Sequence, residues 1–175
     1  MNNQAMFKLS YGLFVLTARD GEKDNGCIIN TAIQAASTPN QLSICVNKTN
    51  YTHDMIVKTG IFTVSILNQK ASFDIFKRFG FASGRDVDKF ADYDECKRGE
   101  NRVYYITENT NAYISVKVSK TVDLGSHTMF VGEITDMEIL GEEPSVTYAY
   151  YFQHIKPKPE ASASPSGKTV WRCKI

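Results

Sequence analysis

Apolar and β-branched residues occur in short runs along most of this chain, and turn-forming residues separate the runs. Such runs predict β-strands. The predicted strands are Leu13 to Arg19, Cys27 to Gln34, Leu42 to Asn47, Ile61 to Leu67, Tyr113 to Val122 and Met129 to Leu140. In the fifth strand, Tyr113 and Ser115 alternate with Ile114 and Val116, and Gly132 interrupts the sixth. Many strands with few helices predict a mainly β protein with short helices, folded as an antiparallel Greek-key barrel.

Two turn signals divide the first three strands. Gly21 to Gly26 contains the pair Asn25-Gly26 between apolar runs, which is typical of a tight β-hairpin turn. Ser37 to Asn40, with Pro39 inside it, predicts the second turn.

Two short helices are expected between the strands. The first is capped by Thr49 or Asn50 and stops at Gly60. The second begins after Ser72 and ends at Gly80. Its apolar positions are Phe73, Ile75, Phe76 and Phe79.

The start of the first predicted helix has the features of an anion site. A helix N-terminus presents unpaired N–H groups and a partial positive charge. Here Lys48, Thr49 and Thr52 flank it, so a phosphate is the expected guest. The alternative is an ordinary capped helix beside a solvated lysine.

The segment Phe79 to Phe90, FGFASGRDVDKF, is rich in small residues and predicts a mobile loop. It carries Arg85 and Lys89 together with two aspartates. One interpretation is a lid that brings cations onto a bound anion, and the other is a solvated cluster of ion pairs. His127, on a turn that enters a strand, is either a catalytic group or an ordinary surface or core histidine.

Composition narrows the functional classes. The 175 residues are 42% hydrophobic with a net charge of +1, which favours one main domain, and the absence of a basic block argues against nucleic acid. No apolar run suits a membrane span, and the first residues lack the pattern of a signal peptide. The four cysteines show no paired spacing, so we expect reduced thiols and a cytoplasmic location.

Several separated blocks together resemble the flavin reductase-like family with the FMN-binding split barrel. These blocks are NGCIINTAIQAAS, LSICVNKTNYTHDMI, FTVSIL, FGFASGRDVDKF, GSHTMFVGEI and TYAYYFQHIK. The resemblance is most specific to the N-terminal flavin domain of the high-molecular-weight rubredoxins of anaerobic bacteria. It implies tightly bound FMN, NADH as substrate and a homodimer. It also implies electron transfer to a rubredoxin domain and then to a flavodiiron oxygen or nitric oxide reductase.

The C-terminal residues support that narrower resemblance. Residues 1–156 are expected to form the FMN-binding domain, and residues 157–167, rich in proline and serine, a linker. Residues 168–175, KTVWRCKI, are similar to the start of a rubredoxin. A rubredoxin iron needs four thiolates, so Cys173 alone predicts no iron site here and a truncated rubredoxin part. The alternative is an ordinary tail.

The resemblance also assigns site residues. Those that match the family's flavin-contacting strands are Asn30, Thr31, Ala32, Cys45, Val46, Asn47 and Lys48. Those that match its phosphate-binding segments are Asn50, Tyr51, Thr52, Ser83, Arg85 and Lys89. His127 matches a histidine at the flavin face, where nicotinamide stacks, and Cys45 packs beside the ring. Tyr150 and Tyr151 match an aromatic pair near the dimer interface, and the segment Tyr148 to Phe152 is expected to be buried there.

These assignments predict an enzyme that moves hydride from NADH to FMN and releases electrons one at a time to rubredoxin. The alternatives are a diffusible flavin reductase that supplies a monooxygenase, a non-enzymatic flavin-binding protein and a small-barrel interaction module. No GxGxxG fingerprint distinguishes NADH from NADPH.

Overall fold

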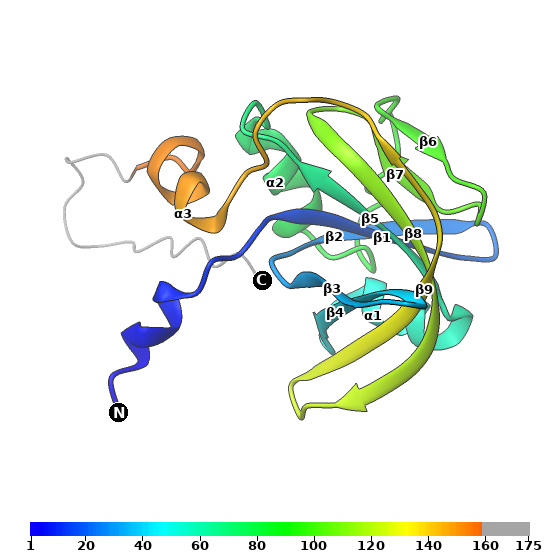
Figure 1. The fold of residues 1–175 in the computed structure, drawn as a ribbon. Coiled ribbons are helices and arrows are strands. Elements are labelled where there is room, and N and C mark those ends of the chain that lie inside the picture. Colours follow the sequence, from blue (N-terminus) through cyan, green and yellow to red (C-terminus); the bar gives the residue numbers. More distant parts are fainter. Residues whose placement is uncertain (159–175) are drawn as a thin grey trace.

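Seven strands pair in one antiparallel sheet in the computed structural model, which describes residues 1–158 (Figure 1). The strands are β1 (Phe14–Asp20), β2 (Lys23–Ile29), β3 (Ala32–Ser37), β4 (Asn40–Asn47), β5 (Ile61–Leu67), β8 (Thr110–Asp123) and β9 (His127–Ile139). Their order in the sheet is β2-β1-β5-β8-β9-β4-β3. The two edge strands, β2 and β3, are separated in sequence by Asn30 and Thr31 alone. The sheet therefore curls until its edges approach there without pairing, which confirms the predicted split barrel.

The remaining elements are short. They are η1 (Asn3–Lys8), α1 (Tyr51–Thr59), α2 (Phe73–Gly80), the two-stranded pair β6 (Cys96–Arg98) and β7 (Tyr104–Ile106), α3 (Tyr148–Tyr150) and η2 (Tyr151–Ile155). Within residues 1–158, none of the helices has the length and apolar character that a membrane crossing requires. The predicted start of a rubredoxin, residues 168–175, and the predicted linker from residue 159 onward lie outside the described residues.

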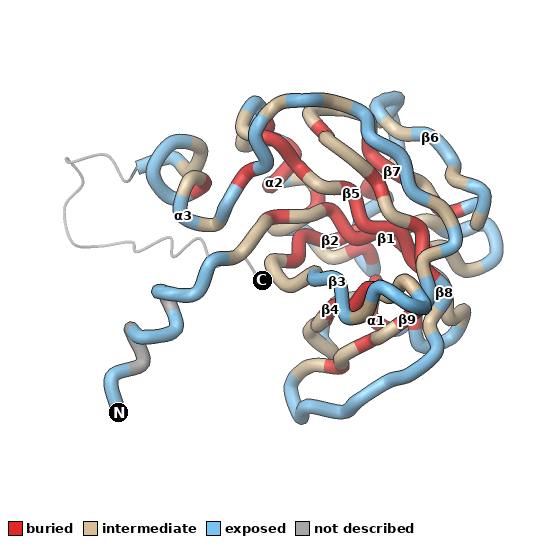
Figure 2. Tube along the Cα trace, in the orientation of Figure 1, coloured by how far each residue is buried: buried red, intermediate tan, exposed pale blue. Residues whose placement is uncertain are grey.

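The core consists of two clusters on opposite faces of the sheet. In β1, Leu16 belongs to the cluster inside the barrel, which α1 closes with Met55. Val15, its neighbour, belongs to the outer cluster beneath α2, which includes Phe76 and Tyr151. Successive side chains of a strand point to opposite faces, so β1 serves both clusters and is buried along most of its length (Figure 2).

The predicted turn at Asn25-Gly26 is wrong. The hairpin turn lies at Gly21, whose φ of 58° suits glycine, and Asn25 and Gly26 are inside β2. Asn25 is 2% exposed, and its side-chain amide donates to the Thr52 hydroxyl at 2.9 Å. A Cβ on Gly26 would lie 3.0 Å from the Phe79 ring. Packing against α1 and α2, rather than a turn, therefore accounts for this pair.

Two predicted strands also differ in detail. The strand expected over residues 27–34 is divided, because β2 ends at Ile29 and β3 begins at Ala32. β9 runs unbroken through Gly132, where a Cβ would lie 2.4 Å from the carbonyl oxygen of Lys117. Glycine there permits the close approach of β8, and it does not interrupt the strand.

The simple alternation predicted for β8 is also interrupted. The pairing register of β8 with β9 shifts between Ser115 and Val116, and again between Val118 and Lys120. These irregularities allow the consecutive residues Ser115 and Val116 both to be buried. The second turn, between Ser37 and Asn40, is confirmed.

Both predicted helices are confirmed. α1 follows Asn50 and ends at Gly60, whose φ is 70° and whose N–H donates to the carbonyl of Ile56. α2 follows Ser72, and its buried side chains are Ile75, Phe76 and Phe79. β6 and β7 were not predicted. Three-residue strands carry too little pattern to be recognised.

Candidate flavin site

The strand residues assigned to the flavin ring lie together at the open edge of the barrel. Asn30 and Thr31 join β2 to β3, and the Thr31 hydroxyl donates to the Asn30 side-chain oxygen at 3.0 Å. The Cys45 N–H of β4 donates to the Thr31 carbonyl at 3.4 Å. All three residues are partly exposed. Burial raises the pKa of the Cys45 thiol, so it is a neutral group at ordinary pH.

β4 leads directly into the start of α1. The Asn47 side-chain oxygen accepts from both the N–H and the hydroxyl of Thr49, each at 2.9 Å, which turns the chain into the helix. Asn50 is the N-cap residue, with φ −74° and ψ 132°, but its side chain makes no capping hydrogen bond. The first N–H groups of α1 are therefore not satisfied by the usual cap.

The Thr52 hydroxyl differs from the prediction. It is fully buried and receives the Asn25 amide, so it faces the protein interior and not a ligand. Thr52 can contribute its backbone N–H to the helix start. The predicted role of its side chain as an exposed flanking hydroxyl is wrong.

A small cavity of about 60 Å³ lies between the start of α1 and the segment that follows α2. Thr49, Asn50 and Tyr51 line one side, and Ser83 and Lys89 line the other. Residues predicted from two distant parts of the sequence thus meet around one space. The Ser83 hydroxyl also accepts the Arg85 N–H at 3.2 Å, which shapes the bend of the loop.

Lys89 is a structural anchor. Only 4% of the residue is exposed, and its ammonium group donates to the carbonyls of Gly26 at 2.8 Å and Phe79 at 3.0 Å. The alternative of a solvated cluster of ion pairs is therefore wrong for Lys89. Its charge lies at the wall of the cavity, but its hydrogen bonds hold the loop to β2 and α2.

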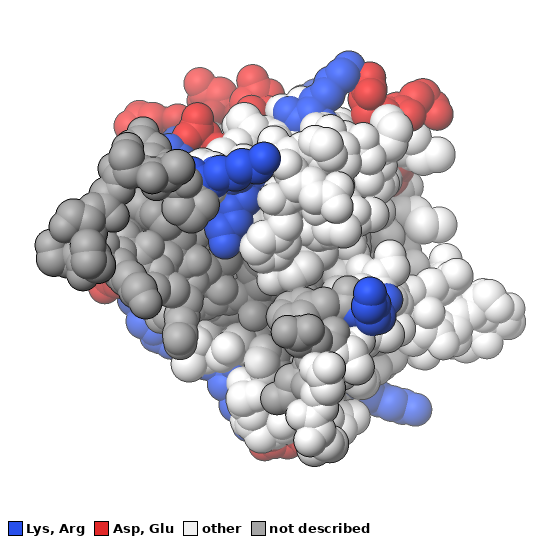
Figure 3. Space-filling model, turned by 90° about the vertical axis from the view of Figure 1, so that its left-hand side faces the viewer, with Lys and Arg blue, Asp and Glu red and all other residues white. Residues whose placement is uncertain are grey.

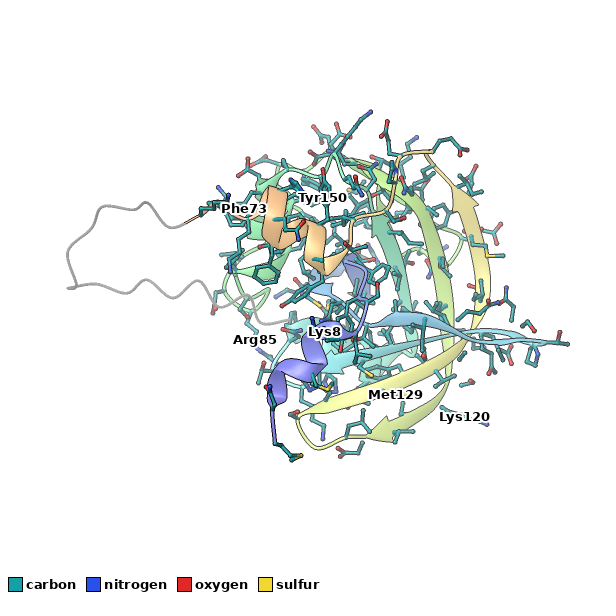
Figure 4. All side chains as sticks on the ribbon, turned by 60° about the vertical axis from the view of Figure 1, so that its left-hand side comes forward. Lys8, Phe73, Arg85, Lys120, Met129 and Tyr150 are labelled. Carbon is teal, nitrogen blue, oxygen red and sulfur yellow. The ribbon has the colours of Figure 1, made fainter. Side chains whose placement is uncertain are left out.

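Arg85 is the accessible cation of the same loop. Its guanidinium pairs with the Asp54 carboxylate of α1 and lies 4.8 Å from the centre of the Tyr51 ring. Hydrogen bonds from His53, and then from Arg85, hold the pKa of Asp54 below its usual range, so the carboxylate stays ionised. Figure 4 shows Arg85 on the outer surface of the molecule, where it can reach a ligand.

Lys48 and His127 do not line this cavity. The Lys48 ammonium lies 2.7 Å from the Asp123 carboxylate, and the Lys48 hydrogen bond keeps the pKa of Asp123 low. His127 faces Asn47 across β4 and β9, and its Nδ1 lies 2.8 Å from the Ser126 hydroxyl. Lys48 lies between β4 and α1, and its N–H donates to the Ser126 carbonyl at 3.0 Å, while His127 is the first residue of β9. Both residues therefore lie against the turn of the β8–β9 hairpin, which Figure 4 places by the labels Met129 and Lys120.

The roles of two residues that shape the site were not predicted. Asp54 holds Arg85 on α1. Asn25 packs beneath the loop, because a Cβ on Gly84 would lie 2.0 Å from the Asn25 side-chain oxygen. That oxygen is buried without a hydrogen-bond partner. The available signal for Asn25 was a polar residue next to a glycine inside an apolar run. That pair, Asn25-Gly26, was interpreted as a turn.

Charges around the site are mixed. On the face of the molecule drawn in Figure 3, the basic side chains lie apart from one another, and acidic side chains gather along the upper edge. Recognition of an anion here depends on a few placed groups and not on a broad positive field.

Comparisons with known proteins identify the family of the chain. A model described as the flavin reductase like domain matches residues 6–158. Over 153 residues the chain is 37% identical to the high molecular weight rubredoxin of Moorella thermoacetica, covering 87% of this chain and 66% of that protein. The chain thus spans just under two thirds of that relative.

A second relative matches along nearly its whole length. The chain is 38% identical over 164 residues to the ferric-chelate reductase (NAD(P)H) of Archaeoglobus fulgidus, covering 94% of this chain and 96% of that protein. Among solved structures, the NADH:FAD oxidoreductase of Streptomyces globisporus C-1027 has the same fold. Its TM-score is 0.72 at 21% identity, with 82% of this chain and 84% of that chain covered.

Proposed function

Because this chain belongs to the family of flavin reductase-like domains, and is a flavin-dependent NAD(P)H oxidoreductase of that type, we propose that it holds FMN tightly and oxidises NADH. The observation that supports FMN binding is the cavity between the start of α1, which lacks a side-chain cap, and residues Ser83 and Lys89. Helix N–H groups and nearby cations suit a phosphate. When bound, FMN would supply the acceptor of hydride and the donor of single electrons.

The chain's own residues have separate tasks in this proposal. Asn50 to Thr52 offer backbone N–H groups to the phosphate, with the Ser83 hydroxyl and the Arg85 guanidinium beside them. Asn30 to Ala32 and Cys45 to Lys48 line the ring at the open edge of the barrel. The neutral thiol of Cys45 gives an uncharged contact. His127 orients the nicotinamide from the neighbouring strand β9.

The proposed electron acceptor is a rubredoxin, which passes electrons to a flavodiiron oxygen or nitric oxide reductase. Similarity to a high molecular weight rubredoxin supports it, as does the sequence WRCKI at the end of the chain. We expect fast flavin reduction by NADH, and a flux to a flavodiiron partner that rises when rubredoxin is added. A tethered rubredoxin should raise the flux more, because tethering raises its effective concentration to roughly millimolar.

A second candidate acceptor is a ferric chelate. Similarity to the ferric-chelate reductase relative, of which the chain covers 96%, supports this candidate. Release of free reduced flavin to a monooxygenase is the third route.

We further propose a homodimer. In the segment Tyr148 to Phe152, which was expected at the interface, Tyr151 is 1% exposed and packs on Phe76 of its own chain at 4.6 Å between ring centres, whereas Phe152 is 45% exposed. The sheet also carries an apolar groove of about 360 Å³ that includes Ala32, Ile33 and Met137. Ile33 and Met137 are 63% and 57% exposed. Because Ala32 also belongs to the ring-lining strand, a second copy here would adjoin the flavin site.

The test is anaerobic. The purified chain, loaded with FMN, should absorb in the flavin bands and bleach on addition of NADH, with rubredoxin, ferric citrate and free flavin then compared as acceptors. Sedimentation of the same sample should give a species near twice 19.6 kDa. A yellow protein that NADH does not bleach would contradict the enzymatic proposal.

A further inference from the structure

A larger cleft, of about 750 Å³, lies beside the small cavity, where the loop after α2 continues beyond Ser83. Three segments line it: the β1–β2 turn from Arg19 to Asp24, the loop from Gly84 to Phe90, and the β6–β7 hairpin through Arg98 and Tyr104. The β1–β2 turn and the β6–β7 hairpin lie on the same side of the barrel (Figure 1). None of the flavin roles assigned above uses this cleft, apart from that of Arg85 at its border.

One wall of the cleft is a stack of flat groups. Phe90 and Tyr104 stack with ring centres 5.0 Å apart and planes 26° apart. The Arg98 guanidinium lies 3.8 Å from the centre of the Tyr104 ring. Arg98 also donates to both oxygens of Asp24, at 3.0 and 2.9 Å, and to the Arg102 carbonyl at 2.7 Å. The side chain keeps 34% exposure.

This arrangement fixes a planar cation at the surface of the cleft. Two-point pairing with a carboxylate sets the orientation of the guanidinium before any ligand arrives. A guanidinium held over an aromatic ring offers its plane as a stacking surface for a nucleobase. Since Arg98 ends the stack of Phe90 and Tyr104, its exposed side is the surface that a base would meet.

The opposite border of the cleft provides charges for phosphates and hydroxyls. Lys23 and Arg85 both line it, and both lie over the Tyr51 ring, at 4.7 and 4.8 Å. Tyr51 lines the small cavity, so these two cations stand at the junction of the two spaces. Asp86 and Asp88 also line the cleft, and their carboxylates suit the hydroxyls of a ribose.

We propose that this cleft binds the adenosine diphosphate part of a dinucleotide, with its base on Arg98 and its phosphates near Lys23 and Arg85. The inference rests on the proposed function, because the flavin phosphate is placed in the adjoining cavity. Two dinucleotides contain this group, FAD and NADH. The chemistry that recognises them is shared, and the experiment distinguishes them.

The experiment uses the full chain and the variant Arg98→Ala, with Lys97→Ala as its matched control. Lys97 is exposed on the same strand and does not line the cleft. In the variant, Asp24 keeps its pairing with Arg19 at 3.0 Å, so the turn retains an ion pair. ADP binding is measured by calorimetry, FMN and FAD binding by fluorescence, and the KM for NADH by steady-state turnover.

We expect the full chain to bind ADP. In Arg98→Ala the affinity for ADP should fall about tenfold, which is the size of one lost base-stacking contact. FMN binding should not change, and Lys97→Ala should change nothing. If the affinity for FAD falls by a similar factor, the cleft binds the adenosine diphosphate part of FAD. If the KM for NADH rises by a similar factor, the cleft binds that part of NADH.

The proposal is overturned if the full chain does not bind ADP, or if Arg98→Ala weakens FMN as much as ADP. Failure of the proposed function has a different signature. In that case neither flavin binds, while ADP binding and its dependence on Arg98 are still measurable.

Discussion

The loop 81–90 and the turn of the β8–β9 hairpin both carry residues that were predicted to contact the cofactor, but the structure holds them differently. The loop is anchored by Lys89, which is buried and bonded to two backbone carbonyls. The hairpin turn is held at its surface by the exposed pair of Lys48 and Asp123. A cofactor needs groups whose positions are fixed before it binds. We therefore expect the loop to determine flavin affinity and the hairpin turn to contribute little.

Removing the anchor should have the largest effect. In Lys89→Met, the carbonyls of Gly26 and Phe79 lose their donor inside the protein, at a cost of roughly 1–3 kcal/mol for each unsatisfied group. We expect the thermal midpoint to fall by about 5–15 °C. FMN affinity should fall about a hundredfold, because Ser83 and Arg85 both lose their positions.

Calorimetry and an FMN titration measure the two losses, and Lys97→Met, on the exposed face of β6, is the control. If Lys89→Met binds FMN as tightly as the unmodified chain, the loop is not the wall of the phosphate site.

Arg85→Ala should have the next largest effect. A charge-assisted hydrogen bond to phosphate contributes roughly 1.5–3 kcal/mol, so FMN affinity should fall about tenfold or more. Riboflavin has no phosphate, and its binding should change little. Fluorescence titration with both ligands gives the comparison. Equal losses for FMN and riboflavin would show that Arg85 acts on the ring or on the fold, and not on the phosphate.

A smaller effect of opposite sign is expected for Asp54→Asn. The Asp54 carboxylate competes with a phosphate for Arg85, and its lowered pKa keeps it ionised near neutral pH. Removing this charge should strengthen FMN binding about two- to fivefold, in the range of a partly exposed ion pair.

The same titration in Arg85→Ala/Asp54→Asn is the control, because the gain should vanish when Arg85 is absent. A gain that persists in the double variant would mean that Asp54 repels the phosphate directly.

Lys48→Ala should have the smallest effect. Its ion pair is exposed to solvent and weakened by screening, and Lys48 does not line the phosphate cavity. We expect FMN affinity to change less than about twofold.

The same variant should raise the pKa of Asp123 toward its usual range, since the Lys48 hydrogen bond is the main cause of its lowering. Carboxyl titration by NMR measures that shift. A tenfold loss of FMN affinity would show that Lys48 contributes to the phosphate site. The hairpin turn would then matter as much for FMN affinity as the loop does.

Local patterns predicted the elements that bury a clear face. Ile61 to Leu67 was predicted with its true bounds, because it is a mostly apolar run that follows Gly60, whose φ is left-handed. α2 was also predicted from Ser72 to Gly80, since its apolar positions repeat with helical spacing. The order of these elements, with the resemblance of six blocks, was sufficient for the fold class.

The same local signals failed where a distant segment determined the residue. Asn25-Gly26 has the composition of a turn, yet Asn25 donates to Thr52 of α1 and Gly26 accommodates Phe79 of α2. Lys89 lies in a segment whose composition is typical of a solvated loop, yet its ammonium group donates hydrogen bonds to carbonyls of β2 and α2. Neither partner is close in sequence, so no local pattern could indicate it.

By itself, the amino-acid sequence determined most strands of the main sheet, the helix that starts at Tyr51 and the set of residues that resembles a flavin site. Hydrophobic periodicity and capping act over a few residues, so they can be recognised along the chain. The tertiary structure decided which members of that set meet at one cavity, which cation is buried and which is accessible, and that Arg98 lies over the Tyr104 ring beside Asp24. These outcomes depend on contacts between residues far apart in sequence, and only the packing of the sheet, α1 and α2 brings those residues together.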